Sequence, residues 1–200
     1  MTRTRAVPIV TLAILVALVA AGCGGSTSAD VHALDATSIP LKITVSSPEF
    51  VNNGTIPKAN TCAGAGTEPT ISWSAVPAHT KTVAVVVDDP DSPKGDFLQW
   101  LVIGLPAKAG SVPSRAPSVS ELDNTGGTRG WSAPCPPAGS THHYRFSVYA
   151  LSDYVCADNG DSSNGPGCSP PSSVQALPQI QGTAIARGVL VGTVVGAGGA

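Results

Sequence analysis

Hydrophobic and polar positions alternate in short runs along this chain, and turn residues separate the runs. Leu41–Val45 and Thr70–Ser74 alternate with a period of two, which predicts strands buried on one face. Thr82–Val87 is almost continuously apolar and predicts a central strand buried on both faces. Three further strands are predicted at Phe97–Leu105, His142–Leu151 and Gly188–Val195.

One segment near the C-terminus has a helical pattern. It extends from Val174 to Arg187, and Ser172 or Ser173 would cap it. Pro178 is compatible with a simple helix only if the helix starts after it. The 22 glycines, the 18 prolines and the small charged fraction of 12% also favour a mainly β fold with many loops. The longest predicted loops are residues 106–130 and 153–173.

The first residues have the pattern of an export signal. Two arginines precede an apolar run over residues 6–21, which is shorter than the roughly 20 apolar residues that a spanning helix needs. The end of this run, Ala20–Cys23, resembles a bacterial lipobox. Residues 1–22 are therefore predicted to be a lipoprotein-type signal peptide, with Cys23 as the lipidated first residue of the mature chain.

Plain cleavage near Ala21, which would leave Cys23 as a thiol, is the alternative. Residues 23–40 are small, polar and unpatterned, which predicts a flexible tether, and residues 41–200 form the predicted domain. We therefore expect an exported protein, held on the outer face of the cell membrane by its lipid or, without lipidation, secreted.

The mature chain is mildly acidic. Removal of Arg3 and Arg5 leaves 9 basic side chains against 13 acidic ones. The absence of a basic stripe argues against a nucleic-acid partner. Membrane contact would come from the lipid rather than from charge.

Export places the cysteines in an oxidising compartment. Besides Cys23, four cysteines remain, and an even number permits two disulfides. Cys156 and Cys168 bracket one loop and are predicted to pair, which leaves Cys62 and Cys135 to pair by default. A zinc site is the alternative, but the chain has neither CxxC spacing nor a Cys/His cluster. No metal or cofactor is therefore predicted.

The polar segment Asp88–Pro93 follows the apolar strand directly, so its carboxylates lie at the rim of a core. Pro90 and Pro93 fix their backbone φ angles, which holds Asp89 and Asp91 in defined directions. One alternative is an ordinary turn in which the Asp side chains accept loop N–H groups. A second alternative is a site for a hard cation.

A second polar segment, residues 134–146, begins another strand. Because neighbours on a strand face opposite sides, His142 and Tyr144 share one face, and His143 and Arg145 share the other. An imidazole and a phenol on one face suit hydrogen bonding to an oxyanion. The alternative is that His142 is a buried histidine with its bonds satisfied, while His143 and Arg145 are simply solvated.

The chain resembles the phosphatidylethanolamine-binding proteins, in their bacterial Raf-kinase-inhibitor-like branch. The resemblance covers about residues 41–195 and rests on pieces that occur in family order. These pieces are Ser46–Phe50, Gly54–Pro57, Thr70–Trp73, Asp88–Pro93, Trp100–Pro106, Pro134–Pro137 and His142–Leu151.

The resemblance implies a mainly β fold, with a large central sheet packed on a smaller sheet and one or two short helices near the C-terminus. It also implies a pocket for phosphate or phospholipid head groups. The residues that match the family's pocket motifs are Asp89, Asp91, Pro93, Pro136, Pro137, His142 and Tyr144.

The chain departs from the family pattern at three places. Gln99 stands where the family has His, and a neutral amide weakens the preference for a doubly charged phosphate. Trp131–Pro134 replaces Tyr-x-Gly-Pro, which adds bulk near the mouth of the pocket. His143 stands where Arg often follows the family's His.

The leading prediction is a binding protein, not an enzyme, with a pocket for a phosphate-bearing or carboxylate-bearing molecule or a phospholipid head group. The alternative is an inhibitor or regulator of a partner protein such as a protease. A weak hydrolase that uses His142 with Asp89 or Asp91 is a third reading, but nothing marks a nucleophile. Homodimer formation is a further expectation from the resemblance.

Lipidation of Cys23 can be tested by mass. Protein purified from membranes of an expressing bacterium should carry a mass gain on its N-terminal residue, and a Cys23→Ala variant should lack it. An unmodified Cys23 in the mature protein would contradict the prediction.

Overall fold

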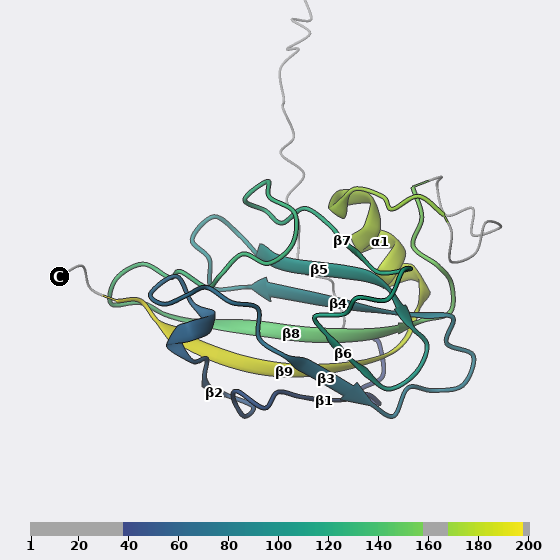
Figure 1. The fold of residues 1–200 in the computed structure, drawn as a ribbon, viewed down its shortest axis with the longest axis horizontal. Coiled ribbons are helices and arrows are strands. Elements are labelled where there is room, and N and C mark those ends of the chain that lie inside the picture. Colours follow the sequence, from purple (N-terminus) through teal and green to yellow (C-terminus); the bar gives the residue numbers. More distant parts are fainter. Residues whose placement is uncertain (1–37, 158–167, 198–200) are drawn as a thin grey trace, which may run out of the picture.

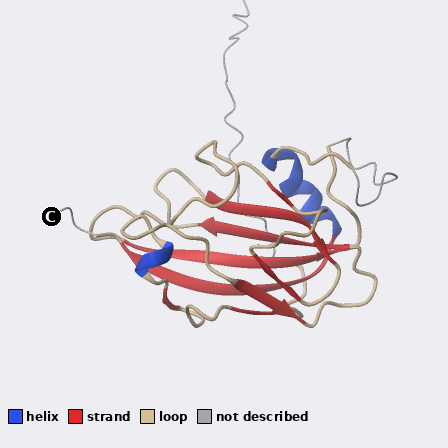
Figure 2. Ribbon diagram, in the orientation of Figure 1, coloured by secondary structure: helices blue, strands red, loops and turns tan. Residues whose placement is uncertain are grey.

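The computed structural model of the protein describes residues 38–157 and 168–197. This part of the chain folds into two β-sheets and an α-helix that are joined by long loops (Figures 1 and 2). The larger sheet has six strands in the order β2 (Gly54–Thr55), β9 (Ala184–Val195), β8 (Thr141–Leu151), β4 (Thr82–Asp89), β5 (Phe97–Pro106) and β7 (Ser120–Glu121). The smaller sheet has three strands in the order β1 (Thr44–Ser46), β3 (Ile71–Ser74) and β6 (Gly110–Val112). The mainly β, two-sheet fold expected from the sequence is confirmed.

Strand β4 lies inside the large sheet and is buried along its whole length. Val83, Val85 and Val87 face the small sheet and join the core that contains Trp73 of β3. The intervening Ala84 and Val86 face the opposite side, where they join the second core, against the α-helix. The large sheet is thus covered on both faces, which explains the continuous apolar run.

The helix α1 (Ser173–Thr183) differs from its prediction. Ser172 caps it and forms a capping box with Gln175, and Pro178 lies inside it. Proline in a helix interior costs about 3 kcal/mol. This cost is offset because the capping box fixes the start, and because one face, with Leu177 and Ile180, is buried on the large sheet.

Three other expectations need correction. The predicted helix was to reach Arg187, but this residue lies in β9, which begins at Ala184. The predicted loop 106–130 contains β6 and β7. The predicted tether ends before residue 40, because Ile39 is buried in the core beside α1.

The two predicted disulfides, Cys62–Cys135 and Cys156–Cys168, are both present. Their formation leaves none of these four thiols for the alternative zinc site. Cys23, the signal peptide and residues 158–167 of the loop between Cys156 and Cys168 lie outside the described residues. No helix in the described ranges is long and apolar enough to cross a membrane.

A substitution at Gly188 of β9 tests how closely the large sheet packs against the segment that contains Ile43. A Cβ atom at Gly188 would lie 2.2 Å from the backbone oxygen of Ile43, and a backbone atom cannot move aside alone. Gly188→Ala should therefore lower the free energy of unfolding by about 1–3 kcal/mol in urea titrations.

Gly182 in α1 provides the matched control. No described atom lies within 4 Å of a Cβ placed there. Gly182→Ala should leave stability unchanged or raise it by up to about 1 kcal/mol, because alanine is the better helix former. Equal stabilities of the two variants would contradict this account of β9 packing.

Candidate anion-binding pocket

A pocket of about 310 Å³ opens at the end of the large sheet where β4 ends and β8 begins. In Figure 1 this is the end nearest the labelled C-terminus. Seven of the eight predicted ligand-binding residues line it: Asp89, Pro93, Gln99, Pro136, Pro137, His142 and Tyr144. The pocket therefore brings together side chains from three strands, β4, β5 and β8, and from two loops.

Asp89 and His142 form a buried pair on the wall of this pocket. Oδ2 of Asp89 lies 2.7 Å from Nδ1 of His142, and each side chain is only 6% exposed. Oδ1 of Asp89 accepts the backbone N–H of Asp91 at 3.0 Å. Both carboxylate oxygens are thus occupied, and the imidazole ring is held in one orientation.

The second ring nitrogen of His142, Nε2, has no hydrogen bond to any described residue. An imidazole bound at Nδ1 by a carboxylate can present Nε2 to a ligand, as an acceptor when neutral and as a donor when protonated. Nδ1 of His142 is thus satisfied by Asp89, as the alternative of a buried histidine expects, and Nε2 remains available to a ligand or to water.

Two neutral polar groups beside this pair lack partners. The hydroxyl of Tyr144 and Oε1 of Gln99 are both buried, without a hydrogen bond to a described residue. Burial and the nearby carboxylate of Asp89 raise the pKa of Tyr144, so the phenol stays protonated. Buried polar groups without partners are uncommon in folded proteins and often mark a place for a ligand or water.

The proline pair lies on a wall that is fixed at several points. The disulfide of Cys135 to Cys62 holds its start. At its end, Pro137 accepts hydrogen bonds from both the backbone N–H and the hydroxyl of Ser140. Gly196, just after β9, passes so close that a Cβ there would lie 1.9 Å from the Pro137 oxygen. Only glycine permits this approach.

Asp91 is the predicted site residue that does not line the pocket. Its Oδ2 instead accepts both the backbone N–H and, at 2.7 Å, the ring Nδ1–H of His143. Burial alone would raise the pKa of Asp91, but these hydrogen bonds outweigh burial and lower it. Arg145 is likewise paired, with Asp88, so the alternative in which His143 and Arg145 are simply solvated is wrong.

Other lining residues were not predicted, namely Ser92, Lys94, Phe97, Ser132, Ala133 and Cys135. Lys94 matters most because it is exposed at the rim and brings a positive charge. It follows Pro93 directly, so its place in the acidic loop was the available signal. Serine hydroxyls at 92 and 132 add neutral hydrogen-bonding groups.

The mainly β fold of two packed sheets, with a small pocket at the end of the larger sheet, is that of a PEBP-like binding protein. The chain belongs to the phosphatidylethanolamine-binding protein family, because residues 46–195 match the family described as "Phosphatidylethanolamine-binding protein".

Individual relatives agree with this assignment. The protein named "Putative lipoprotein LppC" of Mycobacterium tuberculosis is 37% identical over 70% of this chain and 76% of its own length. The crystal structure of Escherichia coli YbcL, described as a member of the mammalian PEBP family, matches with a TM-score of 0.66 and 26% identity over 77% of this chain and 98% of YbcL. A PEBP homologue from Chlamydia trachomatis matches with a TM-score of 0.64 and 28% identity, over 76% and 96% of the two chains.

The lowered pKa of Asp91 predicts how its charge contributes to stability. A carboxylate with a lowered folded-state pKa stabilises the protein above its unfolded-state pKa, and this contribution is lost as the pH falls through the folded-state pKa. At about pH 6, Asp91→Asn should therefore cost about 0.2–1 kcal/mol, as exposed ion pairs do. As the pH falls below about 4 and through the lowered folded-state pKa, the wild-type carboxyl becomes neutral, and the difference in urea unfolding should shrink toward zero. A difference that persists in acid would contradict the assignment.

Proposed function

We propose that this pocket binds a small anionic group, a phosphate or a carboxylate, on a molecule of the cell envelope. The observation that carries the proposal is the buried Asp89–His142 pair, which leaves Nε2 of His142 on the wall of the cavity without a partner in residues 38–157 and 168–197. A protonated imidazole at this position donates a charge-assisted hydrogen bond to an oxyanion.

The charges around the pocket support a singly charged group. The lining side chains with formal charge are Asp89, Lys94 and, when protonated, His142. Their sum is then one positive charge, because Asp89 cancels one of the two cations. Gln99 adds hydrogen-bonding capacity but no charge. A monoanion is therefore matched better than a dianion.

The size of the cavity supports a head group rather than a whole lipid. Its volume of about 310 Å³ lies at the small end of the range of roughly 300–1,000 Å³ for small-molecule pockets. Such a volume accommodates inorganic phosphate, a small carboxylate or a phosphate-bearing head group. The remainder of a larger molecule would lie outside the mouth.

The proposed location is the outer face of the cell membrane, through a lipid on Cys23. The lipobox-like Ala20–Cys23 supports this anchor, and so does the name of the Mycobacterium tuberculosis relative, a lipoprotein. The residues between Cys23 and Ile39 would connect the anchor to the domain. A pocket held near the membrane would meet envelope molecules with phosphate or carboxylate groups.

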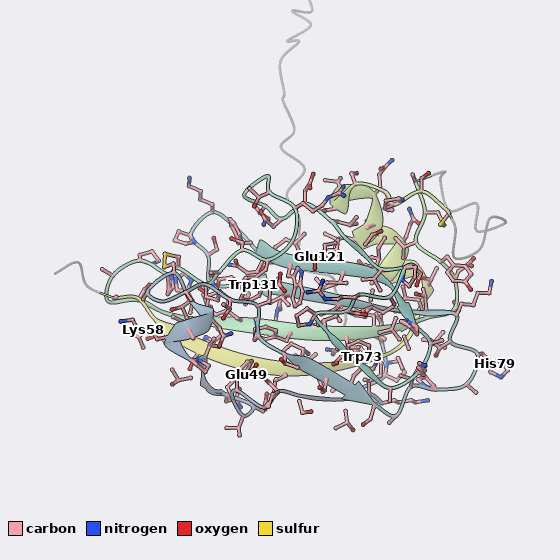
Figure 3. The ribbon with its side chains drawn as sticks, in the orientation of Figure 1. Glu49, Lys58, Trp73, His79, Glu121 and Trp131 are labelled. Carbon is pink, nitrogen blue, oxygen red and sulfur yellow. A yellow bond between two sulfur atoms is a disulfide. The ribbon has the colours of Figure 1, made fainter. Side chains whose placement is uncertain are left out.

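Calorimetry with inorganic phosphate tests the pocket. His142→Ala should abolish measurable binding, because it removes the central donor, and circular dichroism should verify that the variant is folded. His79→Ala is the control, since His79 is exposed at the opposite end of the molecule (Figure 3). Undiminished affinity in His142→Ala would sink the proposal, whereas ester turnover lost in this variant would indicate a hydrolase.

Lys94 gives a second test that does not disturb a buried group. Lys94→Ala should lower phosphate affinity about three- to tenfold and weaken its dependence on salt, because one exposed cation contributes on the order of 1 kcal/mol. Lys42→Ala is the control, because Lys42 is exposed and does not line the pocket. Equal effects of the two substitutions would show that only the overall charge matters.

A further inference from the structure

Strands β4 and β8 separate beside the pocket. Their ladder ends at the pair Asp88–Arg145, whereas β8 continues to Thr141 with only β9 as its partner. The backbone N–H of His143 therefore has no partner strand on the β4 side, and the carboxylate of Asp91 accepts it instead, at 2.7 Å. The side chain of Asp91 thus supplies the acceptor that β4 would supply if its ladder with β8 continued.

Asp91 belongs to residues 90–95, which form the 90–95 loop and most of the connection between β4 and β5. Asp96, the last residue of this connection, interacts electrostatically with Arg145 of β8. Three further hydrogen bonds stay within this connection, from Asp91 N–H to Oδ1 of Asp89, from Ser92 N–H to the carbonyl of Asp89, and from Gly95 N–H to Ser92. The bonds from His143 to Asp91 are the only hydrogen bonds between residues 90–95 and another described strand. The same loop contributes Ser92, Pro93 and Lys94 to the pocket.

We propose that Asp91 is a positioning residue, which clamps the 90–95 loop to β8 through His143 and thereby sets the pocket wall. The proposal rests on the proposed anion-binding function for its effect on affinity, but the clamp itself does not. Both donors of His143 meet one oxygen, Oδ2, so a single carboxylate satisfies the strand end and holds the loop.

Removal of the negative charge of Asp91 distinguishes a role as a clamp from a role in direct contact with the ligand. A carboxylate near the binding site repels an anion, so its negative charge does not help anion binding directly. Asparagine keeps an oxygen for the backbone N–H of His143 and removes the charge. A clamp therefore tolerates Asp91→Asn but not Asp91→Ala.

The test compares the affinity of the full chain for inorganic phosphate by calorimetry across a set of variants. Asp91→Ala should weaken binding about tenfold, and His143→Ala, which keeps the backbone N–H, about threefold. The double variant should bind no more weakly than Asp91→Ala, because both act through one contact. Asp91→Asn should bind within about threefold of the wild type or more tightly.

A matched control exists at the opposite ends of the same two strands. Asp153, just after β8, accepts the ammonium group of Lys81 and the backbone N–H of Tyr154, both at 3.0 Å. Its side chain is 34% exposed, and that of Asp91 is 41% exposed. Asp153→Ala removes a comparable pairing far from the pocket and should leave phosphate affinity unchanged.

Amide hydrogen exchange without any ligand tests the clamp independently. Ser92 and Gly95 should exchange faster in Asp91→Ala than in the wild type, while the β4 and β8 amides stay protected. Unchanged exchange at both residues overturns the clamp. The clamp is also overturned if Asp91→Asn binds phosphate as weakly as Asp91→Ala. It is overturned as well if Asp91→Ala loses binding completely while His143→Ala binds like the wild type. If the wild type binds no phosphate, the proposed function fails, and the exchange result still decides the clamp.

Discussion

Two carboxylates at the end of a strand with both faces buried organise the end of the sheet. Asp88 and Asp89 are almost inaccessible to water, and a buried charge must be paired. Burial raises the pKa of Asp88, and hydrogen bonds from Arg145 offset part of that effect. Asp89 pairs with His142 on the opposite face of the same two strands. Arg145 and His142 of β8 thus pair with the two buried carboxylates of β4. The Asp89–His142 pair lies on the wall of the pocket.

The pocket combines a rigid wall with a loop that is hydrogen-bonded to β8 through one residue, Asp91. A disulfide, two consecutive prolines and the close passage of Gly196 fix the wall that contains Cys135. The 90–95 loop opposite is attached to β8 through Asp91. A pre-formed site loses less entropy when a ligand binds than a site that must be ordered. The rigid wall and the clamp would therefore both reduce the entropy that is lost when a ligand binds.

The electrostatic character of the site follows from a small number of groups. Gln99 and Tyr144 are neutral, and Asp89 compensates the charge that His142 acquires on protonation. The exposed Lys94 adds a positive charge at the rim of the pocket. The amide of Gln99 adds an unpartnered hydrogen-bonding oxygen to the site but no charge.

Local patterns in the sequence determined much of this protein. The apolar run of β4, the common face of His142 and Tyr144, and the pairing of the four cysteines depend on periodicity and spacing, which a linear chain records. Contacts between distant segments were decided by the tertiary structure alone. Periodicity could not show that Asp91 turns to His143, because that contact exists only where β4 leaves β8. It could not show that Pro178 is tolerated in α1 either, because the burial that offsets its cost comes from the sheet.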